Sequence, residues 1–369
     1  MKKILAIALC LLLTGCGQAG RVQDAIQDNL TQKTKALAEG DIDLYTATLT
    51  RTDTYYRNEQ RRWFSEMRAP GMEDLSFEIE DVTLRDDITA VALIRQRHHF
   101  GEDVEIGYPL LYRLEDGQWL DCGIDFQEIP TERYTLKYMD GETHTEDFLD
   151  IIDTAYDNLE TVFTEKPDPD FAVKLYHDQE LLRQRTIPSM GWLFTGWGEA
   201  DESLKLYTGQ TPLSGYLGTV QHELIHHITM GICQNNLPGW LADGIALHYG
   251  NFALAGGDAL SLGYAEKENV ALSLADLEDT DLWEADEQSE TVDWYCASEL
   301  YVKYMIDTYG HDSFMQLFYK AGKKPYNENI LNPDFAAQNN ETMAEVLDTV
   351  WNITKEELSA DYLAWLDAQ

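Results

Sequence analysis

Residues 219–249 contain two informative segments, TVQHELIHHITM at 219–230 and LPGWLADGIALHY at 237–249. The first includes the pattern His-Glu-x-x-His. On a helix, His222 and His226 lie one turn apart on the same face. Two imidazoles at that spacing can bind one zinc ion at about 2.0–2.1 Å. Glu223 follows the first histidine, where its carboxylate can take a proton from a water molecule activated by the metal.

The second segment supplies the candidate for a third metal ligand. Pro238 is typical of a helix start, and apolar residues follow it at helical spacing. Asp243, 17 positions after His226, can then point back toward the histidine pair from an antiparallel helix. If Asp243 does not reach the metal, His248 is the nearest alternative ligand. The other alternative is a core helix whose histidines are satisfied by hydrogen bonds alone.

These two segments together carry a family resemblance. HELIH followed by LPGWLADGIA resembles the gluzincin metallopeptidases, specifically the bacterial peptidase MA-like group. The resemblance implies a zinc cofactor held by His222, His226 and Asp243, a peptide or protein substrate, and hydrolysis with Glu223 as the base. The third ligand of that group is usually Glu, and Asp243 is one methylene shorter. A binding or sensory lipoprotein that kept the fold but lost turnover is therefore the alternative function.

A further catalytic candidate comes from the same resemblance. The spacing of apolar residues predicts a helix over Trp294–Thr308, closed by Gly310. It resembles the helix that carries an oxyanion-binding Tyr at its start in related aminopeptidases. By position, Tyr295 is the candidate for that role, because the oxyanion needs a donor beyond the metal. The alternative is that Tyr295 belongs to the core.

The first 16 residues are typical of a signal segment. Lys2 and Lys3 precede a short apolar run, and LTGC at 13–16 resembles a bacterial lipobox. The resemblance implies removal of residues 1–15, lipid attachment at Cys16, and an extracytoplasmic protein anchored to the cell membrane by its lipid. The alternative is a plain secretory signal with a chance Cys.

Composition limits the range of partners. The chain has 27 basic and 66 acidic residues and a formal net charge of −39, so nucleic acid phosphates would be repelled. The charge is compatible with a preference for basic substrates, and equally with a solvated acidic surface. Three cysteines remain after Cys16, with no Cys-x-x-Cys spacing, and they form neither a disulfide framework nor a cysteine metal site.

Residues 16–128 are predicted to form a small α+β domain. Helical spacing breaks at Gly40-Asp41, and Asp116-Gly117 predicts a tight turn between strands. Strand patterns occupy 77–84, 88–95 and 104–114. This order of helices and a curved antiparallel sheet is similar to the NTF2-like (cystatin-like) fold, whose members bind small ligands or other domains.

Residues 131–369 are predicted to form a mainly helical zincin-like domain with a small sheet, which makes the whole chain α+β. In gluzincins the strand before the metal-binding helix is an edge strand, and Ser203–Tyr207 is expected to take this place and to pair with substrate. The aromatic and glycine-rich loop Trp192–Gly198 either lines a cleft or simply packs. Helix starts with capping boxes are predicted at Thr342 and Thr354.

Overall fold

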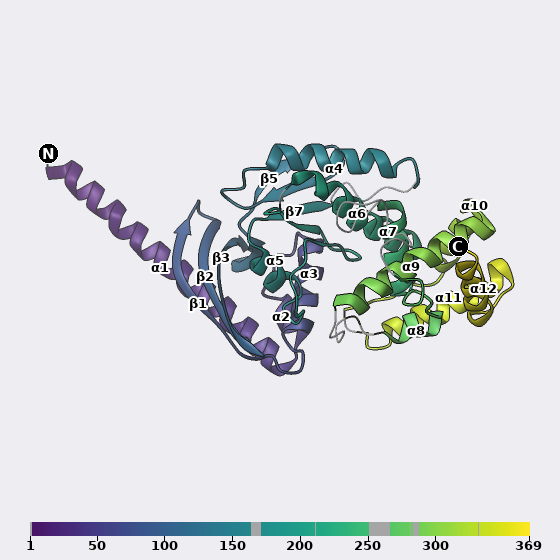
Figure 1. The fold of residues 1–369 in the computed structure, drawn as a ribbon. Coiled ribbons are helices and arrows are strands. Elements are labelled where there is room, and N and C mark those ends of the chain that lie inside the picture. The colour runs from purple at the N-terminus through teal and green to yellow at the C-terminus, as the bar shows by residue number, and fades with distance from the viewer. Residues whose placement is uncertain are drawn as a thin grey trace. The chain divides into compact units, whose positions relative to one another are not determined.

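The protein is mixed α+β, with helices and strands along the chain (Figure 1). The chain divides into two compact units. The computed structural model describes residues 2–163, 171–210, 212–250, 266–280, 282, 288–330 and 332–369. The first unit comprises Met1–Glu128, Tyr138–Asp140 and Asp178–Leu193, and the second comprises Ile129–Lys137, Gly141–His177 and Phe194–Gln369. Over the described residues, no helix is both long enough and apolar enough to cross a membrane.

The first unit combines helices with a four-stranded antiparallel sheet of order β1-β2-β3-β4. Asp41 and Asp53 cap two of its helices by accepting hydrogen bonds from Leu44 N and Tyr56 N. Asp116 and Gly117 both have positive φ angles, as a two-residue hairpin turn between β3 and β4 requires. Its elements are α1 (Lys2–Glu39), α2 (Ile42–Thr46), α3 (Thr54–Glu66), β1 (Glu73–Leu84), β2 (Thr89–Phe100), β3 (Glu102–Glu115), β4 (Gln118–Ile124) and α5 (Gln179–Thr186).

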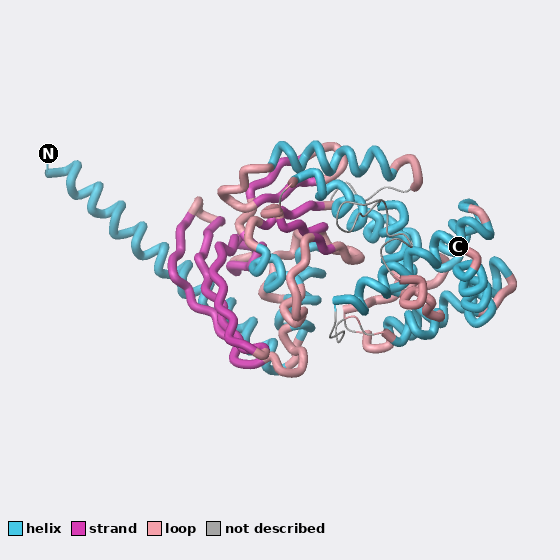
Figure 2. Tube along the Cα trace, viewed as in Figure 1, coloured by secondary structure: helices cyan, strands magenta, loops and turns pink. Residues whose placement is uncertain are grey.

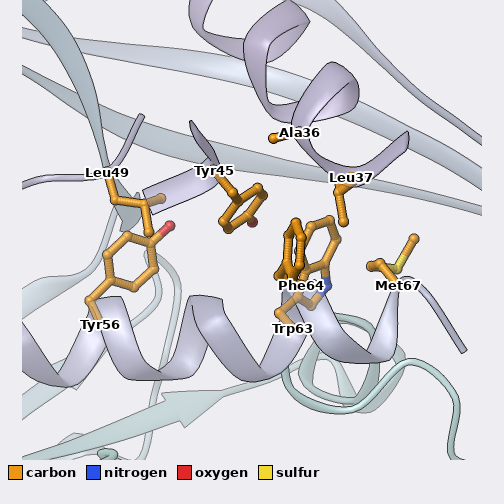
Figure 3. Close-up of a cluster of buried hydrophobic side chains, with 8 residues drawn as sticks. All are labelled: Ala36, Leu37, Tyr45, Leu49, Tyr56, Trp63, Phe64 and Met67. Carbon is orange, nitrogen blue, oxygen red and sulfur yellow. The ribbon is translucent and has the colours of Figure 1, made fainter. Parts of the chain in front are cut away.

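A hydrophobic cluster rich in aromatic rings joins α1, α2 and α3 of the first unit (Figure 3). The Tyr45 ring of α2 lies 5.1 Å from the Phe64 ring of α3, measured between centroids. Helix α5 joins the same core although it follows β7 in sequence, because Trp63 Nε1 donates to the carbonyl oxygen of Gln184 at 2.9 Å. The cluster consists of Ala36, Leu37, Tyr45, Leu49, Tyr56, Trp63, Phe64 and Met67.

Two buried cations also belong to this interior. Lys33 on α1 pairs with Asp121 on β4, and both side chains are almost fully buried. The Arg185 guanidinium of α5 lies over the Trp63 and Tyr108 rings and donates to the Tyr108 hydroxyl at 3.1 Å. The charged groups therefore tie α1, α5 and the sheet together within this unit.

The second unit is built on most of a five-stranded sheet of order β5-β6-β7-β9-β8. β7 and β9 run parallel, and β8 runs antiparallel to β9. Over the described residues after Tyr207 the chain forms helices and loops without a further strand (Figure 2). The strands are β5 (Gln127–Pro130), β6 (Thr135–Tyr138), β7 (Ala172–Tyr176), β8 (Gly196–Trp197) and β9 (Leu204–Tyr207).

The helices of this unit bury aromatic and aliphatic residues on facing sides. The Tyr301 ring of α9 stacks on the Tyr362 ring of α12 at 3.7 Å between centroids. Trp240 of α7 lies 5.7 Å from Tyr301 by the same measure. The helices are α4 (Thr145–Leu159), α6 (Tyr216–Cys233), α7 (Gly239–Gly250), α8 (Leu274–Asp279), α9 (Gln288–Tyr309), α10 (His311–Ala321), α11 (Phe335–Trp351) and α12 (Lys355–Asp367).

Two local predictions are wrong. The predicted edge strand is β9, but it lies between β7 and β8, so the outer strand at this end of the sheet is β8. Thr342 does not start a helix, because it lies within α11, whereas the capping box of Thr354 and Glu357 is confirmed at the start of α12. The sequence pattern at Thr342 does not by itself mark a helix start, because a Thr with Glu three residues later also occurs inside helices, as it does here in α11.

Candidate metal site

The two segments of 219–249 form helices α6 and α7, which pack against each other. Gln234 and Asn235 have φ angles of 52° and 56°, and this left-handed pair ends α6 and reverses the chain. The reversal is held by Asn236 Nδ2, which donates to the Pro325 carbonyl at 2.9 Å, and by Asn339 Nδ2, which donates to the Leu237 carbonyl at 2.7 Å. The asparagines thus fix the direction in which α7 leaves the turn.

This packing brings together three potential metal ligands, His222, His226 and Asp243. The two Nε2 atoms of the histidines lie 3.1 Å apart. Asp243 Oδ1 lies 3.3 Å from His226 Nε2 and 3.7 Å from His222 Nε2. Asp243 therefore reaches the histidine pair despite its short side chain.

These separations fit a tetrahedral metal. Four donors at about 2.0–2.1 Å from a zinc ion stand roughly 3.3–3.4 Å from one another. The three measured distances of 3.1, 3.3 and 3.7 Å lie within a few tenths of an ångström of that value. Two imidazole nitrogens and one carboxylate oxygen are also a donor set that zinc accepts. The residues present could thus hold the metal.

His248, the alternative ligand, lies elsewhere. Its Nδ1 is 2.9 Å from Oε1 of Glu299, a buried carboxylate on α9. The pair cross-links α7 and α9 close to the positions of Asp243 and Tyr295 in these helices. Between the two possible ligands that the sequence leaves open, the geometry favours Asp243.

The electrostatics of the cluster follow from burial and from close opposite charges. Burial alone would raise the pKa of Asp243, but hydrogen bonds from His222 and His226 outweigh it and hold that pKa well below its usual range. Burial alone would lower the pKa of His226, and the hydrogen bond and charge of Asp243 raise it instead. The charges and hydrogen bonds thus couple the three side chains into one unit.

Glu223 is buried beside this cluster. Burial raises the pKa of Glu223, the two histidines oppose the shift, and the carboxylates of Asp243 and Glu199 add to it. A carboxylate with a raised pKa is a better proton acceptor than a solvated one, as a general base requires.

Strand β8 lies directly against Glu223. A Cβ atom built on Gly196 would stand 2.7 Å from Glu223 Oε1, and one built on Gly198 would stand 3.0 Å from Oε2. Only glycine lets the backbone come this close to the carboxylate. Part of the glycine-rich loop Trp192–Gly198 is thus the strand that covers the candidate base.

Tyr295 lies on α9 within electrostatic range of the same groups. Burial raises the pKa of Tyr295 far above its usual value, and the carboxylates of Asp243 and Glu223 contribute to the shift. The phenol is therefore a neutral hydrogen-bond donor near the cluster. Tyr295 is partly buried, which agrees with both a core role and a site role. Its electrostatic link to Asp243 and Glu223 favours a place at the site.

Sequence reasoning did not single out three residues that shape the site. Glu199 and Glu299 belong to no recognisable motif, and no local pattern distinguishes them from the other acidic residues. Gly244 allows α7 to approach α9, since a Cβ there would lie 2.4 Å from the Ser298 carbonyl oxygen. In the sequence, the glycine that directly follows Asp243 is the signal for this close approach of the two helices.

Comparison with known proteins adds little to this geometry. No family model matches the chain, and no curated protein matches it. A similar solved structure is that of an NTF-2 like protein of unknown function from Shewanella oneidensis MR-1. It is 14% identical with a TM-score of 0.23, and the match covers 27% of this chain and 93% of that chain. This weak likeness to an NTF2-like protein carries no inference about function.

Proposed function

We propose that this chain is a zinc-dependent metallopeptidase that hydrolyses peptide bonds. The observation that carries the proposal is the close triangle of His222 Nε2, His226 Nε2 and Asp243 Oδ1 with the buried Glu223 beside it. Neither a structural helix nor a simple metal store requires a carboxylate at that position. The spacing of the donors and the neighbouring base are both what metal-assisted hydrolysis needs.

Each side chain has a distinct chemical task in this proposal. His222, His226 and Asp243 would hold the zinc, which supplies Lewis acidity toward water and the scissile carbonyl. Glu223 takes the proton of the attacking water and returns it to the leaving amine. Tyr295 donates a hydrogen bond to the oxygen on which negative charge develops. An extended peptide would pair along β8, which is the last strand in the order of this sheet and lies beside Glu223.

The proposed function also includes the folds of the two units, a lipid anchor and a class of substrate. We assign a zincin-like fold to the second unit and an NTF2-like fold to the first, following the sequence resemblances. The lipobox-like LTGC at 13–16 supports a lipid at Cys16 and an extracytoplasmic location at the cell membrane. The substrate is a peptide or protein, and the strong negative charge of the chain argues against nucleic acid.

The test uses the detergent-solubilised full chain and two variants. Zinc is measured by mass spectrometry of the purified protein, and hydrolysis is measured with a broad fluorogenic peptide library. We expect one zinc per chain in the parent and in Glu223→Gln, and no retained zinc in Asp243→Ala. Hydrolysis is expected only in the parent. Asp307→Ala, which removes an acid paired with Lys303 at 2.9 Å, is the control and should behave as the parent.

A second function is favoured by one specific residue. The gluzincin resemblance predicts Glu as the third ligand, and Asp243 departs from it. A lipid-anchored binding or sensory module with the same fold would tolerate this change. That alternative predicts a zinc-loaded parent that cleaves no library peptide and a Glu223→Gln strain without a phenotype. Either result would count against the peptidase.

A further inference from the structure

The chain between α10 and α11 runs along the end of α6. Gly322 leaves no room for a Cβ beside the Ile232 carbonyl oxygen, so the backbone after α10 touches the last turn of α6. Farther along, the Pro325 carbonyl oxygen accepts a hydrogen bond from Asn236 Nδ2 at 2.9 Å. Residues 322–330, here termed the strap, therefore lie against the turn that reverses the chain between α6 and α7.

Asn327 is the most fully bonded residue of the strap. Its backbone N–H donates to the Gln234 carbonyl oxygen at 3.0 Å, and its carbonyl oxygen accepts from Asn235 Nδ2 at 2.9 Å. Its Nδ2 donates to Asn339 Oδ1 at 2.8 Å, and its Oδ1 accepts from Asn332 Nδ2 at 3.0 Å. The residue is only 7% exposed. A buried polar group whose bonds are all satisfied is held rigidly in one orientation.

The turn that Asn327 contacts has a strained backbone. Gln234 and Asn235 have φ angles of 52° and 56°, in the left-handed region where a side chain costs energy. Such residues persist when the surrounding structure fixes them. Asn327 bonds both residues, and its partner Asn339 donates to the Leu237 carbonyl oxygen at 2.7 Å just beyond them. The strained turn is thus held from the strap and from α11.

The direction of this turn decides where Asp243 lies. Helix α7 begins at Gly239, two residues after Leu237, and Asp243 lies in its second turn. Asp243 Oδ1 is 3.3 Å from His226 Nε2 and 3.7 Å from His222 Nε2. A metal–ligand bond tolerates changes of only about 0.2 Å, so a small rotation of the turn would carry the carboxylate out of reach.

We propose that Asn327 is a positioning residue for the metal site. It holds the strained turn in the one conformation from which α7 presents Asp243 to the histidine pair of α6. This inference rests on the proposed function, because it takes the histidines and Asp243 as ligands of one metal. Asn327 itself touches none of these three side chains, and it acts only through the backbone of the turn and through Asn339.

The experiment compares the zinc affinity of the purified full chain with that of two variants. Asn327→Ala should raise the zinc dissociation constant roughly ten-fold or more, as the loss of a group that orients metal ligands does. Asn329→Ala is the matched control on the same strap, because its Nδ2 donates to Glu199 Oε2 at 2.9 Å and not to the turn. Its zinc affinity should equal that of the parent. Affinity is measured by competition with a chromophoric chelator, well below the unfolding temperature of each metal-free protein.

A second substitution separates positioning from a general loss of structure. Gln234→Gly removes the cost of the left-handed φ angle, because glycine adopts that conformation without strain. In the Asn327→Ala background it should restore most of the zinc affinity, since the turn then needs less support from the strap. If Asn327 were merely structural, its loss would lower the unfolding temperature of the metal-free protein and leave zinc affinity unchanged.

Hydrogen exchange followed by mass spectrometry adds a readout that needs no metal. Backbone amides of residues 234–243 should exchange roughly ten-fold faster in Asn327→Ala and at the parent rate in Asn329→Ala. Unchanged exchange or unchanged zinc affinity in Asn327→Ala, or no recovery in the double variant, overturns the positioning role. A parent that binds zinc and cleaves no peptide defeats the peptidase proposal alone. A parent that binds no zinc defeats both.

Discussion

Gly244 of α7 lies so close to Ser298 of α9 that a Cβ on the glycine would stand 2.4 Å from the serine carbonyl oxygen. The two helices therefore touch through their backbones, one residue after Asp243. Asp243 and Tyr295 belong to these two helices, so the contact sets the distance between a candidate ligand and a candidate oxyanion donor. The His248–Glu299 pair, 2.9 Å apart, fixes the same two helices a little farther along.

Gly244→Ala should separate α7 from α9 and displace Asp243. We expect a loss of about 1–3 kcal/mol in the free energy of unfolding, because the new methyl group meets backbone that has no room to move. Zinc affinity should fall with it. Thermal unfolding and zinc titration measure the two effects. Gly239→Ala is the control, since nothing lies within 4 Å of a Cβ at the start of α7. Equal behaviour of the two variants would contradict the prediction.

Gly196→Ala should impair catalysis without removing the metal. The added methyl group would stand 2.7 Å from Glu223 Oε1 and 2.9 Å from Thr219 Cγ2, so either β8 or the carboxylate must shift. A misplaced general base costs on the order of a hundred-fold in kcat. Peptide hydrolysis and zinc content are compared with those of Gly191→Ala, whose Cβ would meet nothing within 4 Å. Unchanged hydrolysis in Gly196→Ala would contradict the prediction that the contact of β8 with Glu223 positions the general base.

Tyr295→Phe should lower kcat roughly a hundred-fold while KM and zinc content stay near those of the parent. Removing one hydrogen-bond donor to the oxyanion weakens binding of the transition state and leaves ground-state binding largely intact. Steady-state kinetics separate the two constants. Tyr304→Phe, a buried tyrosine farther along α9, controls for general effects on this helix. A matching loss in both variants would mean that Tyr295 is a core residue.

Asp121→Asn should destabilise the first unit by about 3–5 kcal/mol, because the buried Lys33 would lose its charged partner. Urea unfolding followed by circular dichroism measures this change. Asp116→Asn removes an acid from an exposed pair with Arg51 and keeps a residue that tolerates the φ angle of 48°. Little change is expected there, and a similar loss in both variants would argue against a special role for the buried pair.

The same carboxylate predicts a pH dependence of stability. Burial alone would raise the pKa of Asp121, but the charge and hydrogen bond of Lys33 outweigh it and lower that pKa. A pKa that is lower in the folded state stabilises the fold above the unfolded value of about 3.9, and this contribution is lost as the pH falls below about 4. Urea midpoints measured from pH 6 down to pH 3 should therefore fall more steeply for the parent than for Asp121→Asn. Parallel curves would contradict the assignment.

Local patterns predict the parts of the fold that depend on neighbours in sequence. The break at Gly40-Asp41, the turn at Asp116-Gly117 and the capping box at Thr354 are confirmed because backbone preferences and short-range hydrogen bonds decide them. The strand positions of the first unit agree with the predicted ranges within a few residues. The place of Ser203–Tyr207 in its sheet was not predicted correctly, since strand order depends on pairing between distant segments.

In the candidate site, too, some features are determined by local sequence and others by contacts between distant segments. The sequence by itself determined that His222 and His226 share a helix face with Glu223 beside them, because the helical repeat fixes their spacing. Only the tertiary structure decided that Asp243 and not His248 joins the pair. It also decided that Gly196 and Gly198 cover Glu223, and that Asn329 holds Glu199 nearby. These contacts join residues far apart in the chain, and they form only when α6, α7 and β8 pack together.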